Sequence, residues 1–106
     1  MELPMNKLQI TPEAKRDLQA IDLYISKELK NPIAAKNVIR RITQDLRILL
    51  QFENAGPSLQ EKTGYPTELR LLSCGDYIAF YKVDGNTVSV ARILNGKQDY
   101  LRILLD

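Results

Sequence analysis

The segment ELRLLSCGDYIAFYKVDGNTVSVARILNGKQDY, residues 68–100, contains three stretches in which apolar side chains recur at every second position. Such alternation is typical of β-strands. The three predicted strands are Glu68–Ser73, Tyr77–Val83 and Thr87–Leu94. The connections between them, Cys74-Gly75-Asp76 and Asp84-Gly85-Asn86, contain the glycine that hairpin turns favour. The segment therefore predicts three consecutive antiparallel strands.

The middle strand indicates that both faces of this sheet are apolar. Tyr77, Ala79 and Tyr81 fall on one face. Ile78 and Phe80 fall on the other. Because one helical layer covers only one face, the second face is expected to bury against a partner chain or to be covered by the long loop before the sheet.

Two amphipathic helices are predicted upstream of the sheet. In both, an N-capping residue followed by proline marks the start, and apolar residues recur every three or four positions. The predicted elements are a strand over Lys7–Ile10, helices over Thr11–Leu29 and Asn31–Phe52, a loop over Glu53–Thr67 and a short final helix over Gln98–Leu105. The short link between the helices predicts an antiparallel hairpin. The fold class is therefore predicted as α+β with the order βααβββ, a helical hairpin packed on a mainly antiparallel twisted sheet.

The composition is that of a globular protein: 106 residues, 44% hydrophobic and 26% charged. It predicts a single domain over residues 1–106, with residues 1–5 as a flexible extension. The longest apolar runs are far shorter than the roughly 20 residues of a membrane span. The first residues also lack the basic and apolar regions of a signal peptide, so a cytoplasmic location is expected.

Histidine is absent from the sequence, and Cys74 is the only cysteine. Mechanisms that pair serine or cysteine with histidine are therefore excluded, as is a zinc site, and neither a metal nor a cofactor is expected. Any chemistry must use Lys, Arg, Tyr, Asp or Glu. The net charge of +2 does not by itself indicate nucleic-acid binding, which would need a local patch of charge.

With these elements in order, the chain resembles the RelE/ParE superfamily of type II toxin–antitoxin toxins over nearly its whole length. The matching segments are TPEAKRDL, LYISKELKNPIAAKNVIRRI, GPSL and LRLLSCGDYIAFYKVDGNTVSVARILNGKQDY. The last is the most specific, because these proteins pair an arginine-containing strand with a GxYxxFYxV strand and an RILxGxxDY strand end. The resemblance implies a small toxin that a co-expressed antitoxin neutralises by wrapping its surface.

The superfamily offers two activities. RelE-like members are endoribonucleases that cut mRNA in the ribosomal A site, whereas ParE-like members poison DNA gyrase and are not known as nucleases. RelE-like nucleases commonly carry an arginine after the first tyrosine of a GYRLVY strand, and here GDYIAFY places Ile78 at that position. The interpretation favoured by Ile78 and by the absence of histidine is a ParE-like toxin without enzymatic activity. An mRNA interferase and a non-toxic interaction domain are the alternatives.

A nuclease would have to use four residues near the sheet. Arg70 and Arg92 would hold the phosphate, Lys97 would stabilise charge, and Tyr100 would act as a weak acid or base. The alternative is a purely structural role, in which both arginines form ion pairs with Glu68, Asp76 or Asp99. Likewise, Tyr100 is alternatively part of a capped final helix.

A basic stripe is predicted on the second helix. At 100° per residue around a helix, its members Lys36, Arg40 and Arg47 lie within about 40° of one another. The stripe is interpreted either as a solvated face or as a contact for an acidic partner, the antitoxin or gyrase. The complete set of expected target-binding or antitoxin-binding residues is Lys36, Arg40, Arg47, Ile78, Phe80, Arg92 and Lys97. The expected partners are a cognate antitoxin in a hetero-oligomer, DNA gyrase or ribosome-bound mRNA as the target, and operator DNA only through the antitoxin; no membrane contact is expected.

Overall fold

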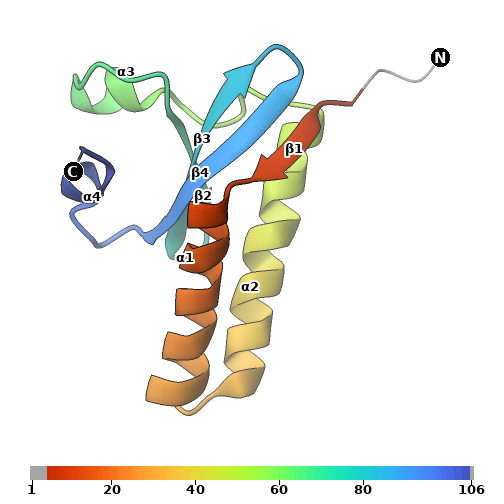
Figure 1. Cartoon of the computed structure of the whole chain (residues 1–106), viewed down its shortest axis with the longest axis vertical. Helices are drawn as coiled ribbons and strands as arrows, with labels where there is room; N and C mark the ends of the chain where they lie inside the picture. Colours follow the sequence, from red (N-terminus) through yellow and green to blue (C-terminus); the bar gives the residue numbers. More distant parts are fainter. Residues whose placement is uncertain (1–4, 106) are drawn as a thin grey trace.

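Figure 1 shows the computed structural model of the chain, which describes residues 5–105. In chain order its elements are β1 (Lys7–Ile10), α1 (Pro12–Leu23), α2 (Pro32–Leu46), α3 (Leu59–Thr63), β2 (Arg70–Cys74), β3 (Tyr77–Asp84), β4 (Thr87–Asn95) and α4 (Tyr100–Leu105). A π-helical turn, η1 (Tyr24–Glu28), extends α1, and a 3-10 turn, η2 (Arg47–Leu50), extends α2. The predicted N-terminal extension lies outside the described residues except for Met5, which is exposed.

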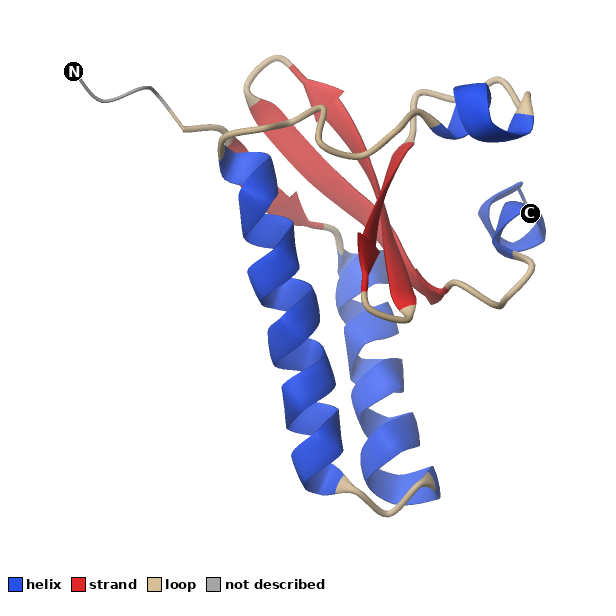
Figure 2. Ribbon diagram, turned by 180° about the vertical axis from the view of Figure 1, so that it is seen from behind, coloured by secondary structure: helices blue, strands red, loops and turns tan. Residues whose placement is uncertain are grey.

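The strands form one mixed sheet in the order β1-β4-β3-β2. Strand β1 runs parallel to β4, and the other two neighbouring pairs are antiparallel. Figure 2 shows α1 and α2 side by side as a hairpin whose far end projects beyond the sheet. The α+β class, the βααβββ order and the short C-terminal helix are confirmed. No helix within residues 5–105 is long and apolar enough to cross a membrane.

The helix starts follow the capping residues that the sequence contains. The Thr11 hydroxyl accepts a hydrogen bond from the Ala14 amide, and the Asn31 side chain accepts one from the Ala34 amide. In both helices a proline occupies the first turn, where its missing N–H costs nothing. The apolar stripes of the two helices then bury Ala14, Ile42 and other residues against Tyr81 and its neighbours on one sheet face.

The second face of the sheet is covered by the chain itself. Leu59 of α3 joins Leu71, Phe80 and Leu94 in a second buried cluster, against which the apolar side chains of α4 pack. In Figures 1 and 2, α3 and α4 lie together on this side. The Phe80 and Tyr100 rings have centroids 5.1 Å apart. The sequence left open whether a partner chain or the preceding loop would cover this face. The segment before the sheet covers it, together with α4.

The prediction that Glu53–Thr67 is only a loop was wrong, because it contains α3. The Ser58 hydroxyl caps this helix by accepting a hydrogen bond from the Glu61 amide, and Gly64 ends it with a φ of 79°. A five-residue helix is too short to show a 3.6-residue period, which is why the pattern missed it. The segment before α3 also pairs with the edge of β2, where the Leu71 amide donates to the Pro57 carbonyl at 3.0 Å.

A β-bulge changes which side chains of β4 face the hairpin. Val90 pairs with Tyr81 and Arg92 pairs with Phe80, so Ala91 is an extra residue on β4. As a result Val90 and, three residues later, Ile93 are both buried on the hairpin side. Simple alternation along the sequence does not predict this shift.

Gly56 fixes the loop to the sheet. Its amide donates to the buried Tyr81 hydroxyl at 2.9 Å, and its carbonyl accepts from the Arg70 Nε at 2.7 Å. A Cβ added at Gly56 would lie only 2.2 Å from the Leu71 carbonyl oxygen. Glycine is therefore required at this position by close approach of two backbone segments.

Gly56→Ala should destabilise the protein by about 1–3 kcal/mol, because the loop must move and lose its contacts with Tyr81 and Arg70. The free energy of unfolding in urea is the measurement. Gly96→Ala is the matched control, since a Cβ at Gly96 comes no closer than 3.4 Å to its neighbours. An equal loss of unfolding free energy in both variants would contradict the requirement for glycine at position 56.

Candidate functional site

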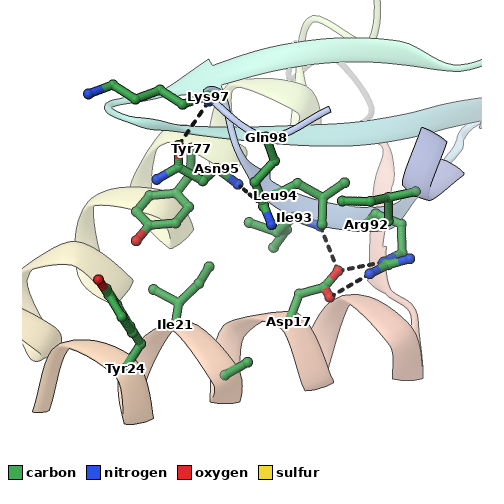
Figure 3. Close-up of a pocket in the computed structure, with 12 residues that line it drawn as sticks. Asp17, Ile21, Tyr24, Tyr77, Arg92, Ile93, Leu94, Asn95, Lys97 and Gln98 are labelled. Carbon is green, nitrogen blue, oxygen red and sulfur yellow. Dashed lines mark hydrogen bonds and ion pairs between the residues drawn. The ribbon is translucent and has the colours of Figure 1, made fainter. Parts of the chain in front are cut away.

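A groove of about 620 Å³ lies between α1, the end of β4 and the segment that leads to α4 (Figure 3). Ile21 of α1 and Ile93 of β4 give it an apolar floor. Tyr24 and Tyr77 face each other at one end, and Tyr24 is 55% exposed. Burial raises the pKa of the Tyr77 phenol, which therefore stays neutral at physiological pH. The groove can hold an apolar side chain and offers hydrogen bonds at its rim.

The opposite end of the groove is closed by a bidentate ion pair. Asp17 accepts hydrogen bonds from the Arg92 Nε at 2.8 Å, from the Arg92 Nη2 at 3.0 Å and from the Ile93 amide at 2.9 Å. The side chain of Asp17 is only 13% exposed, and that of Arg92 is 31% exposed. The hydrogen bond to Asp17 raises the pKa of Arg92 further above its usual range. The Arg92 guanidinium therefore stays charged at physiological pH.

The predicted partners of Arg92 were wrong: it pairs with Asp17 and not with Glu68, Asp76 or Asp99. The reason is the short edge strand. β1 ends at Ile10, opposite Val90, so the part of β4 that follows has an open edge toward α1. Arg92 reaches α1 across this edge.

Arg70 binds the chain's own backbone. Its Nε donates to the Gly56 carbonyl at 2.7 Å, and its Nη2 contacts the Asn54 carbonyl at 3.4 Å. In the strand register Arg70 lies opposite Tyr81, whereas Arg92 lies opposite Phe80. Since successive residues of β3 point to opposite faces, the two arginines start from opposite faces of the sheet. They are not brought together around one phosphate.

Lys97 and Tyr100 do not complete a catalytic set either. Lys97 is exposed, and in Figure 3 its side chain extends away from the Asp17–Arg92 pair. Its amide is held by the Asn95 side chain at 2.9 Å. Tyr100, the first residue of α4, packs its ring against Phe80. The four candidate nuclease residues therefore have separate local roles.

The remaining predicted contact residues fall into two groups. Ile78 is half-buried and Phe80 is fully buried in the second cluster, so Phe80 presents no surface in this structure. Lys36, Arg40 and Arg47 are all exposed on the outer side of α2 and its last turn.

The Cys74 thiol and the acidic side chains are the other groups that could carry chemistry. Cys74 ends β2 and is buried, and this burial raises the pKa of its thiol to about 11. A neutral, enclosed thiol is a poor nucleophile. Among residues 5–105, no group of three or more His, Cys, Asp and Glu side chains is arranged to hold a metal ion.

Sequence reasoning missed Asp17 and Tyr24. Asp17 lies on α1 and Tyr24 begins η1, which extends it. Beside the buried Ile21 an acid and a phenol look like ordinary boundary residues of an amphipathic helix. The available signal was the lone arginine inside the apolar run ARIL, residues 91–94, which needs a counter-charge once the strand is covered by helices.

Comparison with solved structures finds the same fold in chains of toxin–antitoxin systems. A chain of the chromosomal ParDE toxin–antitoxin system from P. aeruginosa matches with 27% identity and a TM-score of 0.70, covering 88% of this chain and 98% of that chain. A chain of the RelBE2 toxin–antitoxin complex from Mycobacterium tuberculosis has the same fold, with 19% identity and a TM-score of 0.56. The match covers 86% of this chain and 98% of that chain.

The family model for the ParE toxin of the type II toxin–antitoxin system parDE matches residues 8–100. The chain belongs to this family. No curated protein matches the chain. The resemblance inferred from the sequence is thereby confirmed, with the ParE branch as the nearer one.

Asp17→Ala should lower the free energy of unfolding by about 2 kcal/mol, because it leaves a partly buried guanidinium and the Ile93 amide without their acceptor. Chemical denaturation followed by circular dichroism measures the loss. The exposed pair Arg41–Asp45, also joined at 2.8 Å, is the matched control. Asp45→Ala should cost much less, because the ion pair that it breaks is exposed to solvent. A loss at Asp17 no larger than at Asp45 would show that the bidentate pair does not anchor α1.

Proposed function

We propose that the protein is a growth-inhibiting toxin that acts by binding DNA gyrase rather than by cutting RNA. The observation that carries this proposal is the use of both candidate phosphate ligands inside the protein: Arg92 is held by Asp17 and Arg70 by the loop carbonyls. Cleavage by a 2′-hydroxyl needs free cations near the scissile phosphate. Membership of the ParE toxin family supports the same choice.

A cognate antitoxin is the proposed partner, and operator DNA is reached through it. The matched solved structures belong to toxin–antitoxin complexes. Because α3 and α4 cover the second sheet face, the groove floored by Ile21 and Ile93 is the better place for an antitoxin side chain than the sheet itself. The exposed ring of Tyr24 would pack against that side chain.

Purified toxin should inhibit DNA supercoiling by gyrase and accumulate the cleaved gyrase–DNA complex. A parallel translation extract should keep its mRNA intact, because the nuclease residues do not converge. Cut mRNA with unaffected supercoiling would instead support the interferase. Harmless expression without any antitoxin would support a non-toxic interaction domain.

Ala20→Arg should weaken neutralisation by the protein encoded in an adjacent antitoxin reading frame by about tenfold or more. The longer side chain would fill the groove that Ala20 lines, and a desolvated, badly placed charge costs more than about 1.4 kcal/mol. The amount of antitoxin needed to restore gyrase activity measures the effect. Gln19→Arg, at an exposed neighbouring position of α1 outside the groove lining, is the control. Equal antitoxin demand for both variants would place the antitoxin elsewhere.

A further inference from the structure

The positive net charge of the chain is concentrated in one helix. The whole chain has 15 basic and 13 acidic residues. Residues 32–47 contain four of the basic residues and a single acid, Asp45. The rest of the chain is left with 11 basic and 12 acidic residues, a slight negative balance. The net positive charge of the protein therefore comes entirely from helix α2 and its cap residue Arg47.

Three of these cations form a line on the outer side of the helix, which we call the α2 stripe: Lys36, Arg40 and Arg47. All three are exposed, and the stripe lies about 120° around the helix from the buried residues Ile42 and Leu46. At about 1.5 Å per residue the stripe is about 16 Å long. Because the helix is packed on the sheet along its buried side, the spacing of the three charges is fixed.

Among residues 5–105, no acidic side chain forms an ion pair with the stripe. Within residues 5–105 the ion pairs are Arg92–Asp17 and Arg41–Asp45, and neither involves the stripe. Asp45, the acid on α2, is held at 2.8 Å by Arg41 on the flank of the helix. The stripe thus offers three unneutralised cations to a ligand.

The side chains around these cations distinguish between two kinds of polyanionic ligand. A protein interface has an apolar centre and a polar rim. Here the order is reversed, because the exposed apolar residues lie beyond the two ends of the stripe, Ile33 at one and Ile48 and Phe52 at the other. Between the cations the exposed neighbours are polar: Asn37, Thr43 and Gln44 are uncharged, and Arg41 is already paired with Asp45. Arginine, lysine and such hydroxyl and amide groups are the usual ligands of nucleic-acid phosphates.

We propose that the α2 stripe binds the phosphate backbone of duplex DNA without reading its sequence. Cations at fixed spacing on a rigid helix match the regular charge array of a stiff duplex. A single strand would call for exposed aromatic rings between the cations, and residues 36–47 contain none. This goes beyond the proposed function and does not depend on gyrase being the target. It also means that the toxin adds a DNA contact of its own to any contact made through an antitoxin.

The test is fluorescence anisotropy of a labelled duplex of about 20 base pairs and scrambled sequence, titrated with the full-length toxin. Three phosphate contacts predict a slope of about −2.7 in log K against log salt. Affinity should therefore fall about 40-fold between 50 and 200 mM salt. Absence of salt-dependent binding would overturn the proposal.

Two triple variants separate the stripe from net charge. K36Q/R40Q/R47Q should lose at least about tenfold in affinity at low salt, and its salt slope should approach zero. The control K62Q/K82Q/R102Q removes the same charge from other exposed positions and should stay within about twofold of the unmodified protein. An unchanged melting temperature for both variants verifies folding. Equal losses in the two variants would show that only net charge matters, which overturns the assignment.

An acidic polypeptide is the competing ligand. Labelled polyglutamate of matched charge should bind more weakly than the duplex. If it binds more tightly than the duplex and this binding is lost only in K36Q/R40Q/R47Q, the stripe is a protein-binding surface and the DNA proposal is wrong.

Discussion

The ion pair between Asp17 and Arg92 is the interaction on which the site depends. It joins residues 75 positions apart in the sequence and connects α1 directly to β4. The third hydrogen bond, from the Ile93 amide, ties the same carboxylate to the strand backbone. A carboxylate with three donors in a mostly buried position is well compensated for its lost hydration. The pair thereby links α1 to β4 at one end of the groove, and in this structure it engages the Arg92 guanidinium.

The sheet is apolar on both faces, and a different pair of helices covers each face. The larger helical hairpin covers one face with a continuous core. Two short helices, α3 and α4, cover the other with a smaller one. None of the α4 residues is itself fully buried, although together they enclose Phe80. Within residues 5–105, helices of the chain itself thus cover both faces of the sheet. The groove between α1 and the end of β4 stays open beside them.

The strands and the two long helices were predictable because each has a local signal. Period-two alternation located β2, β3 and β4, and Thr11 and Asn31 located the helix starts. Helix α3 was not predictable from its period, since five residues are too few to show one. The bulge at Ala91 left no mark in the alternation, because Ile93 and Leu94 are both apolar and fit either face.

The sequence by itself determined the class of protein, through the order of its segments, the missing histidine and the apolar Ile78 in the third strand. It also supplied the charges of α2, since helical spacing alone aligns Lys36, Arg40 and Arg47. Only the tertiary structure decided what the arginines of the sheet do. Their partners, Asp17 and the loop carbonyls at Gly56 and Asn54, are distant in sequence and meet them only after the helices and the loop pack on the sheet. Ion pairing of this kind depends on three-dimensional proximity, which local sequence patterns do not encode.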